Sequence, residues 1–236
     1  MSVITGRTDL TRLSKRLEKY QIVSFDVFDT LISRVVSDPH DVFSVVERKY
    51  NRRFPDSPLS GFREQRVACE RRVRERVGFK EVNFESIYRE VAAHYGESTA
   101  DHLKELELEY ELKLSIPHPV GSQLLKAVKA AGRRVILTSD MYLPKEFIAR
   151  LLEKNGITGY DELFVSCEFN RMKSDGTLYR HIYEHYGIEP AEMIHIGDNL
   201  KSDYLRPLRL RSKSCWLPRP RARAEISDAA LLDKFL

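Results

Sequence analysis

The sequence predicts an α/β protein whose parallel sheet is interrupted by a separate helical insertion. Segments with helical spacing occur at 121–131, 144–154 and 177–186, and each stops at a glycine or an Asn-Gly pair. Strands that alternate with helices form parallel sheets with right-handed crossovers. Short apolar runs with the profile of buried strands occupy 21–25, 135–138, 163–166 and 193–196, with a weaker fifth candidate at 214–217.

The segment from about 35 to 116 breaks this alternation, because it contains no convincing buried strand. Residues 106–114 alternate apolar and charged side chains like a half-buried strand, but their Leu and Glu content and one continuous apolar face favour a helix. The expected domains are therefore a core of 1–34 with 117–236 and a helical domain of 35–116. The expected helices of that domain are 39–51, 60–77, 84–95 and 98–114.

Composition places the chain among globular proteins. With 42% hydrophobic and 31% charged residues, its 236 residues suffice for a buried core, which excludes general disorder. The first twenty residues are charged and lack a long apolar stretch, so we expect a cytoplasmic protein with no membrane association. Cys69, Cys167 and Cys215 lie far apart without metal-binding or redox spacing and are expected to be reduced packing residues.

Polar groups follow the ends of the expected strands. FDVFDTL at 25–31 follows the first strand, TSD at 138–140 the second, and GDNLKSD at 197–203 the fourth, while Lys173 precedes the helix at 177–186. Ligands of parallel sheets bind at the carboxyl ends of the strands, so these groups are expected to meet there. Together they supply a nucleophile, a hydroxyl, a lysine and an acidic pair.

This ordered set resembles the four motifs of the haloacid dehalogenase (HAD) superfamily over about residues 22–210. The resemblance implies a Rossmann-like core and hydrolase activity, and the helical insertion is similar to the cap domain that many members carry between their first two motifs. Asp26 is the expected nucleophile. A carboxylate at the end of a buried strand can attack phosphorus and form an aspartyl phosphate that water then hydrolyses.

A metal site is expected beside Asp26. Asp198 and Asp203 would approach it across the sheet edge, and clustered carboxylates repel one another unless a cation is present. Mg²⁺ suits such oxygen ligands and neutralises charge on a substrate phosphate. The resemblance adds the backbone carbonyl of Phe28 as a further metal ligand. Asp203 has an alternative role, in which it orients Asn199 or the metal-bound waters.

The remaining motif residues are expected to bind the substrate phosphate. Lys173 would screen the nucleophile and the phosphoryl oxygens, in a position similar to the third motif of the family. Ser139 best fits the second-motif hydroxyl that binds a phosphoryl oxygen, and Thr138 replaces it if the register shifts by one residue. Asp140 is expected to cap the turn.

One position departs from the family pattern. Family phosphatases usually carry a second Asp two residues after the nucleophile, which protonates the leaving group, and here that residue is Phe28. For a phosphatase, two alternatives follow: Asp29 or a residue of the helical domain replaces this acid, or the leaving group needs little protonation, as in acyl or anomeric phosphates. A phosphonatase or dehalogenase would need no such acid, although the metal motif argues against a dehalogenase. A non-catalytic binding module is the third alternative.

The expected substrate is a small anionic phosphorylated metabolite. FDVFDTL with SDMYL resembles HAD domains that accompany glycosyltransferases in bacterial surface-polysaccharide pathways, which suggests a phosphosugar or a polyol phosphate. Arg34, at the entry to the helical domain, is the preferred arginine for binding it. Arg-rich stretches at 63–76 and 206–223 raise a nucleic-acid binder as a competing class, but no recognition motif accompanies them and no nucleic-acid partner is expected. The oligomeric state and the role of the segment 218–236 stay open.

Overall fold

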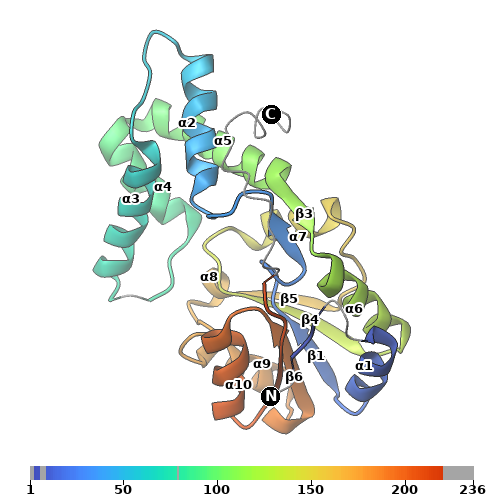
Figure 1. Cartoon of the computed structure of the whole chain (residues 1–236). Coiled ribbons are helices and arrows are strands. Elements are labelled where there is room, and N and C mark those ends of the chain that lie inside the picture. The colour runs from blue at the N-terminus through green and yellow to red at the C-terminus, as the bar shows by residue number, and fades with distance from the viewer. Residues whose placement is uncertain (1–2, 6–8, 79, 220–236) are drawn as a thin grey trace. The chain divides into compact units, whose positions relative to one another are not determined.

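The computed structural model describes residues 3–5, 9–78 and 80–219. These residues form two compact units, coloured along the chain in Figure 1. The core unit contains the described residues of Met1–Ser33 and Ile116–Pro220, and the helical unit contains those of Arg34–Ser115. At the two crossings within the described residues, the boundaries expected from the sequence differ from these divisions by one residue. Residues 220–236, which the sequence analysis assigns to the core, lie outside the described residues.

Five parallel strands form the sheet of the core unit, in the order β5-β4-β1-β6-β7. Strand β1 is central, and its Phe25 pairs with Leu137 of β4 on one side and with Ile196 of β6 on the other. The four expected strands and the weaker fifth one are all present, and the predicted α/β fold is confirmed. The strands are β1 (Ile22–Phe25), β4 (Arg134–Ser139), β5 (Glu162–Val165), β6 (Met193–Gly197) and β7 (Lys213–Trp216).

Helices cover both faces of this sheet. Apolar side chains of α9 (Thr177–Tyr186) pack on one face, against Ile22, Ile136 and Phe164 of three adjacent strands. Right-handed crossovers place α6 (Pro119–Ala130) and α7 (Lys145–Lys154) on the opposite face, as Figure 1 shows for α6. The alternation of buried strand and helix that the sequence predicts therefore produces a three-layered core unit.

Shorter elements complete the core unit and were not among the expected ones. They are α1 (Leu10–Leu17), α8 (Ser166–Phe169), the 3₁₀ turn η1 (Pro190–Glu192), the π-helical turn η2 (Leu200–Leu205) and α10 (Arg206–Arg209). Helix α1 begins at Asp9, whose side chain accepts a hydrogen bond from the backbone N–H of Arg12 at 3.0 Å. No described helix of the chain is long and apolar enough to cross a membrane.

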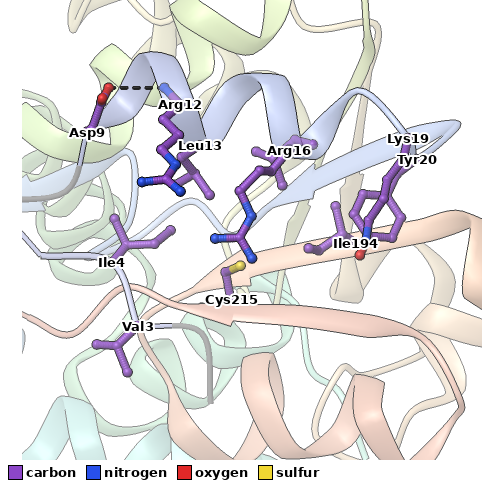
Figure 2. Close-up of a pocket in the computed structure, with 11 residues that line it drawn as sticks. Val3, Ile4, Asp9, Arg12, Leu13, Arg16, Lys19, Tyr20, Ile194 and Cys215 are labelled. Atoms are coloured by element: carbon purple, nitrogen blue, oxygen red, sulfur yellow. Dashed lines mark hydrogen bonds between the residues drawn. The ribbon is translucent and has the colours of Figure 1, made fainter.

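A cavity of about 570 Å³ lies beside α1 in the core unit. Figure 2 shows Arg12 and Arg16 of α1 above a floor that includes Ile4, Ile194 and Cys215. None of its lining residues belongs to the motifs that the sequence analysis identifies. Residues 6–8, next to this cavity in the chain, lie outside the described residues.

The helical unit consists of the four helices that the sequence predicts. Segment 106–114 is helical, as its Leu and Glu content favours. Arg66 is fully buried and donates two hydrogen bonds of 2.8 Å to Glu107, which also accepts one of 2.7 Å from the hydroxyl of Tyr88. Arg66, one arginine of the Arg-rich stretch 63–76, is therefore an interior residue of this unit. The helices are α2 (Asp41–Arg53), α3 (Phe62–Arg76), α4 (Phe84–Tyr95) and α5 (Glu97–Leu114).

Two short strands carry the chain out of the core unit and back. β2 (Ile32–Arg34) and β3 (Ser115–Pro117) pair as a separate two-stranded sheet, which the sequence analysis does not predict. Three-residue strands are too short to show a periodic pattern, which explains the omission.

Gly121, in the first turn of α6, permits a close approach to the loop after β1. A Cβ atom at this position would lie 1.7 Å from the backbone oxygen of Thr30. We expect Gly121→Ala to lower the free energy of unfolding by about 3 kcal/mol, the upper end for overpacking. Urea denaturation measures this, with Ser122→Ala at the partly exposed neighbouring position as a control that shifts stability by less than about 0.5 kcal/mol. An unchanged unfolding midpoint in Gly121→Ala would contradict the close packing.

Candidate active site

The motif loops of the core unit meet at the carboxyl end of the sheet. Asp26 directly follows β1, Ser139 is the last residue of β4, and Asp198 directly follows β6. Since these three strands are adjacent and parallel, their carboxyl ends lie at one edge of the sheet. Lys173, in the loop before α9, joins them there through its side chain.

Three carboxylates form a cluster at this edge. Asp26, Asp198 and Asp203 each offer one oxygen, and these oxygens lie within 4.8 Å of one another. Asp203 reaches the cluster from η2, and its carboxylate accepts a hydrogen bond of 3.0 Å from the backbone N–H of Asn199. A Cβ atom on Gly197 would lie 2.5 Å from the same carboxylate, so the tight turn after β6 requires glycine. Asp203 therefore both joins the acidic cluster and holds the loop that carries Asp198.

Lys173 bridges two members of the cluster. Its Nζ donates hydrogen bonds of 2.6 Å to Asp26 and 2.7 Å to Asp203, and its side chain is only 3% exposed. Asp140 holds the lysine loop by accepting hydrogen bonds from the backbone N–H groups of Lys173 at 2.7 Å and Ser174 at 3.2 Å. Asp140 thus caps the loop of Lys173 rather than only its own turn. The sequence places these two loops 33 residues apart, and the fold brings them together.

The cluster contains more carboxylates than lysines, and this shifts the pKa values of its members. Burial raises the pKa of Asp26 to about 8, and the neighbouring carboxylates of Asp203 and Asp198 add to this rise against the opposing charge of Lys173. Burial disfavours the charge of Lys173, but Asp203 and Asp26 outweigh it and raise the pKa of the lysine. One lysine does not neutralise three clustered carboxylates. An oxygen-rich cluster with surplus negative charge fits a hard divalent cation such as Mg²⁺.

The two candidate hydroxyls occupy different surroundings. Thr138 Oγ1 lies 2.9 Å from Ser24 Oγ, within the sheet, and Ser24 Oγ lies 2.8 Å from His195 Nδ1. Ser139 forms no side-chain hydrogen bond with a described residue, although it is 2% exposed. The Thr138 hydroxyl is therefore engaged in the interior, and the Ser139 hydroxyl is available at the strand end. Their roles in substrate binding stay predictions.

His195 is a site residue that the sequence analysis does not identify. It lies in β6, fully buried, with Nε2 at 3.4 Å from Asp203 Oδ1. Burial lowers the pKa of His195, which favours the neutral ring beside Asp203. The signal in the sequence is a single polar residue inside the otherwise apolar run of this strand.

The loop after Asp26 carries the departure from the family pattern. Asp29 has a φ of 60°, in the left-handed region, and its backbone N–H donates to the Ile32 oxygen at 2.6 Å. Its carboxylate, 5% exposed, forms an ion pair of 3.2 Å with Nε of Arg219. The Asp29 carboxylate is thus already engaged by a cation. Phe28 is partly exposed in this loop, and its predicted role as a carbonyl ligand of the metal stays a prediction.

Arg219 is a second site residue that the sequence analysis does not single out. The same Nε atom that pairs with Asp29 also donates to Asp198 Oδ2. Burial raises the pKa of Asp198, and Arg219 acts against this rise. Arg219 therefore brings positive charge to the acidic cluster from the chain segment after β7.

Arg34, the arginine predicted to bind substrate, has a partner inside the helical unit. Its Nε and Nη2 donate hydrogen bonds of 2.8 Å and 3.0 Å to the two carboxylate oxygens of Glu111, and both side chains are buried. This bidentate pair joins the end of β2 to α5. The role of Arg34 in substrate binding stays a prediction.

Comparisons with known proteins agree with this architecture. The model of the haloacid dehalogenase-like hydrolase family matches residues 20–205, which includes all four motifs. No curated protein matches the sequence.

Solved structures of similar fold include a protein described as a phosphatase and proteins described as dehalogenases. The HAD-hydrolase YfnB from Bacillus subtilis bound to magnesium is 16% identical, with 84% of this chain and 88% of that chain covered and a TM-score of 0.59. A 2-haloacid dehalogenase from Pseudomonas syringae pv. Tomato is 13% identical, with 84% and 86% covered and a TM-score of 0.64. A predicted phosphoglycolate phosphatase from Haemophilus somnus is 14% identical, with 85% and 86% covered and a TM-score of 0.54. With its four motifs at one sheet edge and a family match over most of its length, the chain belongs to the haloacid dehalogenase-like hydrolases.

Proposed function

We propose that this hydrolase removes phosphate from a small phosphorylated metabolite in a magnesium-dependent reaction. The observation that carries the proposal is the cluster of Asp26, Asp198 and Asp203, bridged by buried Lys173. Displacement of a halide from carbon requires no metal cluster, whereas transfer of a charged phosphoryl group gains from every nearby cation. The magnesium-bound structure of YfnB is similar in fold and supports the same reading.

Each residue of the site has a role in this reaction. Lys173 binds one oxygen of Asp26, and the other oxygen attacks phosphorus to form an aspartyl phosphate while the bond from phosphorus to the leaving-group oxygen breaks. Water then hydrolyses the aspartyl phosphate, which releases inorganic phosphate and restores Asp26. Lys173 and the hydroxyl of Ser139 then stabilise the negative charge on the phosphoryl oxygens.

The metal ligands come from the same edge of the sheet. Asp26, Asp198 and Asp203, with the carbonyl of Phe28, would hold Mg²⁺, which when bound neutralises charge on the phosphoryl group. Asp203 keeps this set together because it also holds Lys173 and the backbone of Asn199.

The leaving group is expected to need little protonation. Phe28 occupies the position of the usual acid, and Asp29 is engaged in an ion pair with Arg219. Acyl phosphates and anomeric sugar phosphates leave without strong acid assistance, because their leaving groups are weak bases. An anomeric phosphosugar therefore fits both this site and the resemblance to enzymes of surface-polysaccharide pathways.

A second candidate function is hydrolysis of a carbon–halogen or carbon–phosphorus bond. The observation that favours it is the missing acid at Phe28, and fold neighbours include haloacid dehalogenases. The intact acidic cluster weighs against it for halides, and no lysine of the helical domain shows the features of a Schiff-base former.

Parallel assays of phosphate and halide release distinguish these candidates. We expect inorganic phosphate release from at least one acyl or anomeric phosphate in Mg²⁺, with a loss of at least about 100-fold after metal removal by EDTA. Adding back Mg²⁺ restores the rate and serves as the control. Halide release from 2-haloacids that persists in EDTA, without phosphate release, would contradict the proposal and favour the second candidate.

A further inference from the structure

The segment after β7 is fixed to the acidic loop by two hydrogen bonds. Trp216 Nε1 donates to the backbone oxygen of Asp198 at 2.7 Å, and the backbone N–H of Leu217 donates to the oxygen of Gly197 at 2.9 Å. Arg219 follows two residues later. These two hydrogen bonds, both made by residues just before Arg219, hold this segment beside the loop of Asp198.

Arg219 is held through one nitrogen and leaves two others available. Its Nε contacts both Asp198 and Asp29, while the side chain is 56% exposed. Within the described part of the chain, its two terminal nitrogens donate no hydrogen bond. A guanidinium carries paired N–H groups whose geometry matches two oxygens of a phosphate.

We propose that Arg219 is a substrate-binding residue whose terminal nitrogens bind the oxygens of the substrate phosphate and of released inorganic phosphate. This inference rests on the proposed phosphatase function. An incoming phosphate meets the four carboxylates of Asp26, Asp29, Asp198 and Asp203, which repel it. The positive charges of Lys173 and Arg219 offset that repulsion. The Lys173 side chain is buried, whereas the Arg219 side chain is largely exposed.

Asp29 gains a defined role in this arrangement. Its carboxylate points at Arg219, and its left-handed backbone, with a φ of 60°, is uncommon for a residue other than glycine. Asp29 is thus a positioning residue that holds the guanidinium beside Asp198.

Binding of inorganic phosphate tests the inference directly. The full chain is titrated with phosphate at saturating Mg²⁺ by calorimetry, and the fluorescence of Trp216, the single tryptophan of the chain, reports on the same loop. We expect Arg219→Gln to weaken phosphate binding by at least about 10-fold. Arg219→Lys keeps the charge but loses the paired N–H groups, so its affinity for phosphate is expected to lie between those of the wild type and Arg219→Gln. Arg209→Gln, at an exposed arginine of α10, is the matched control and changes affinity less than about 2-fold.

Two separate measurements keep the outcomes distinct. Magnesium affinity is measured in the absence of phosphate, because Arg219 contacts the predicted metal ligand Asp198. If Arg219→Gln changes magnesium affinity alone and binds phosphate like the wild type, Arg219 is only a counter-ion and the inference is wrong. A wild-type protein that neither binds nor releases phosphate overturns the proposed function itself, and the inference with it.

Discussion

Asp26→Asn is expected to reduce phosphate release by at least about 10³-fold, because an amide cannot attack phosphorus to form the aspartyl phosphate. Asp26 lies 2.6 Å from Lys173 and within 4.8 Å of the other two carboxylates, so it is the carboxylate that Lys173 and the strand end position. Steady-state rates at saturating Mg²⁺ measure the loss. Acid-quenched mass spectrometry of the peptide containing residue 26 should show a phosphate adduct in the wild type alone.

Stability of the same variant controls for misfolding. In the folded protein without metal, burial raises the pKa of Asp26 to about 8, against 3.8 for an ordinary aspartate in the unfolded chain. The folded state therefore binds more protons between these values, and the wild type loses stability as the pH rises. Asparagine does not titrate, so without metal the variant should be at least as stable as the wild type at pH 8. An active Asp26→Asn variant would place the nucleophile elsewhere.

Lys173→Met is expected to lower the rate by about 10²- to 10³-fold and the free energy of unfolding by about 3 kcal/mol. Methionine keeps much of the length of the side chain but removes the charge between Asp26 and Asp203, both of which are buried. The rate falls because the phosphoryl charge loses its nearest fixed cation. Stability falls because two buried carboxylates lose their partner.

Kinetics and urea denaturation of Lys173→Met separate these two effects. Lys201→Met, at an exposed lysine of η2, is the control and is expected to behave as the wild type in both measurements. A Lys173→Met protein that is less stable but retains the wild-type rate would restrict the lysine to a structural role.

The fold and the main site follow from sequence because both depend on local patterns. Buried strands appear as short apolar runs, and the chemistry of a parallel sheet collects where such runs end, so Asp26, Ser139 and Asp198 are visible without a structure. Lys173 is visible through its place in an ordered set of motifs.

Other parts of the site depend on long-range contacts that no local pattern reports. Nothing in the sequence near Arg34 indicates its partner, because Glu111, which accepts its hydrogen bonds, lies 77 residues later in the chain. Arg219 lies in a Pro- and Arg-rich stretch after the weakest strand, where nothing in the spacing indicates that it reaches Asp29 and Asp198. His195 looks like part of an apolar strand and is significant only because Asp203 lies beside it.

The order of events in folding follows from the position of β1. Ser24 of β1 bonds to Thr138 of β4, 114 positions later, and to His195 of β6, 171 positions later, so the central strand has no partner until most of the chain has been synthesised. Within the intervening unit, α2 packs on α3, α3 on α4 and α4 on α5, and α2 also packs on α5. All these contacts lie within residues 34–115, and contacts that are closer in the chain form faster. We infer that this unit collapses first and draws the two ends of its long loop together, which lowers the entropic cost of pairing β1 with β4. The nucleophile loop would then be among the last segments to become ordered, after the ribosome has released the strand that completes it.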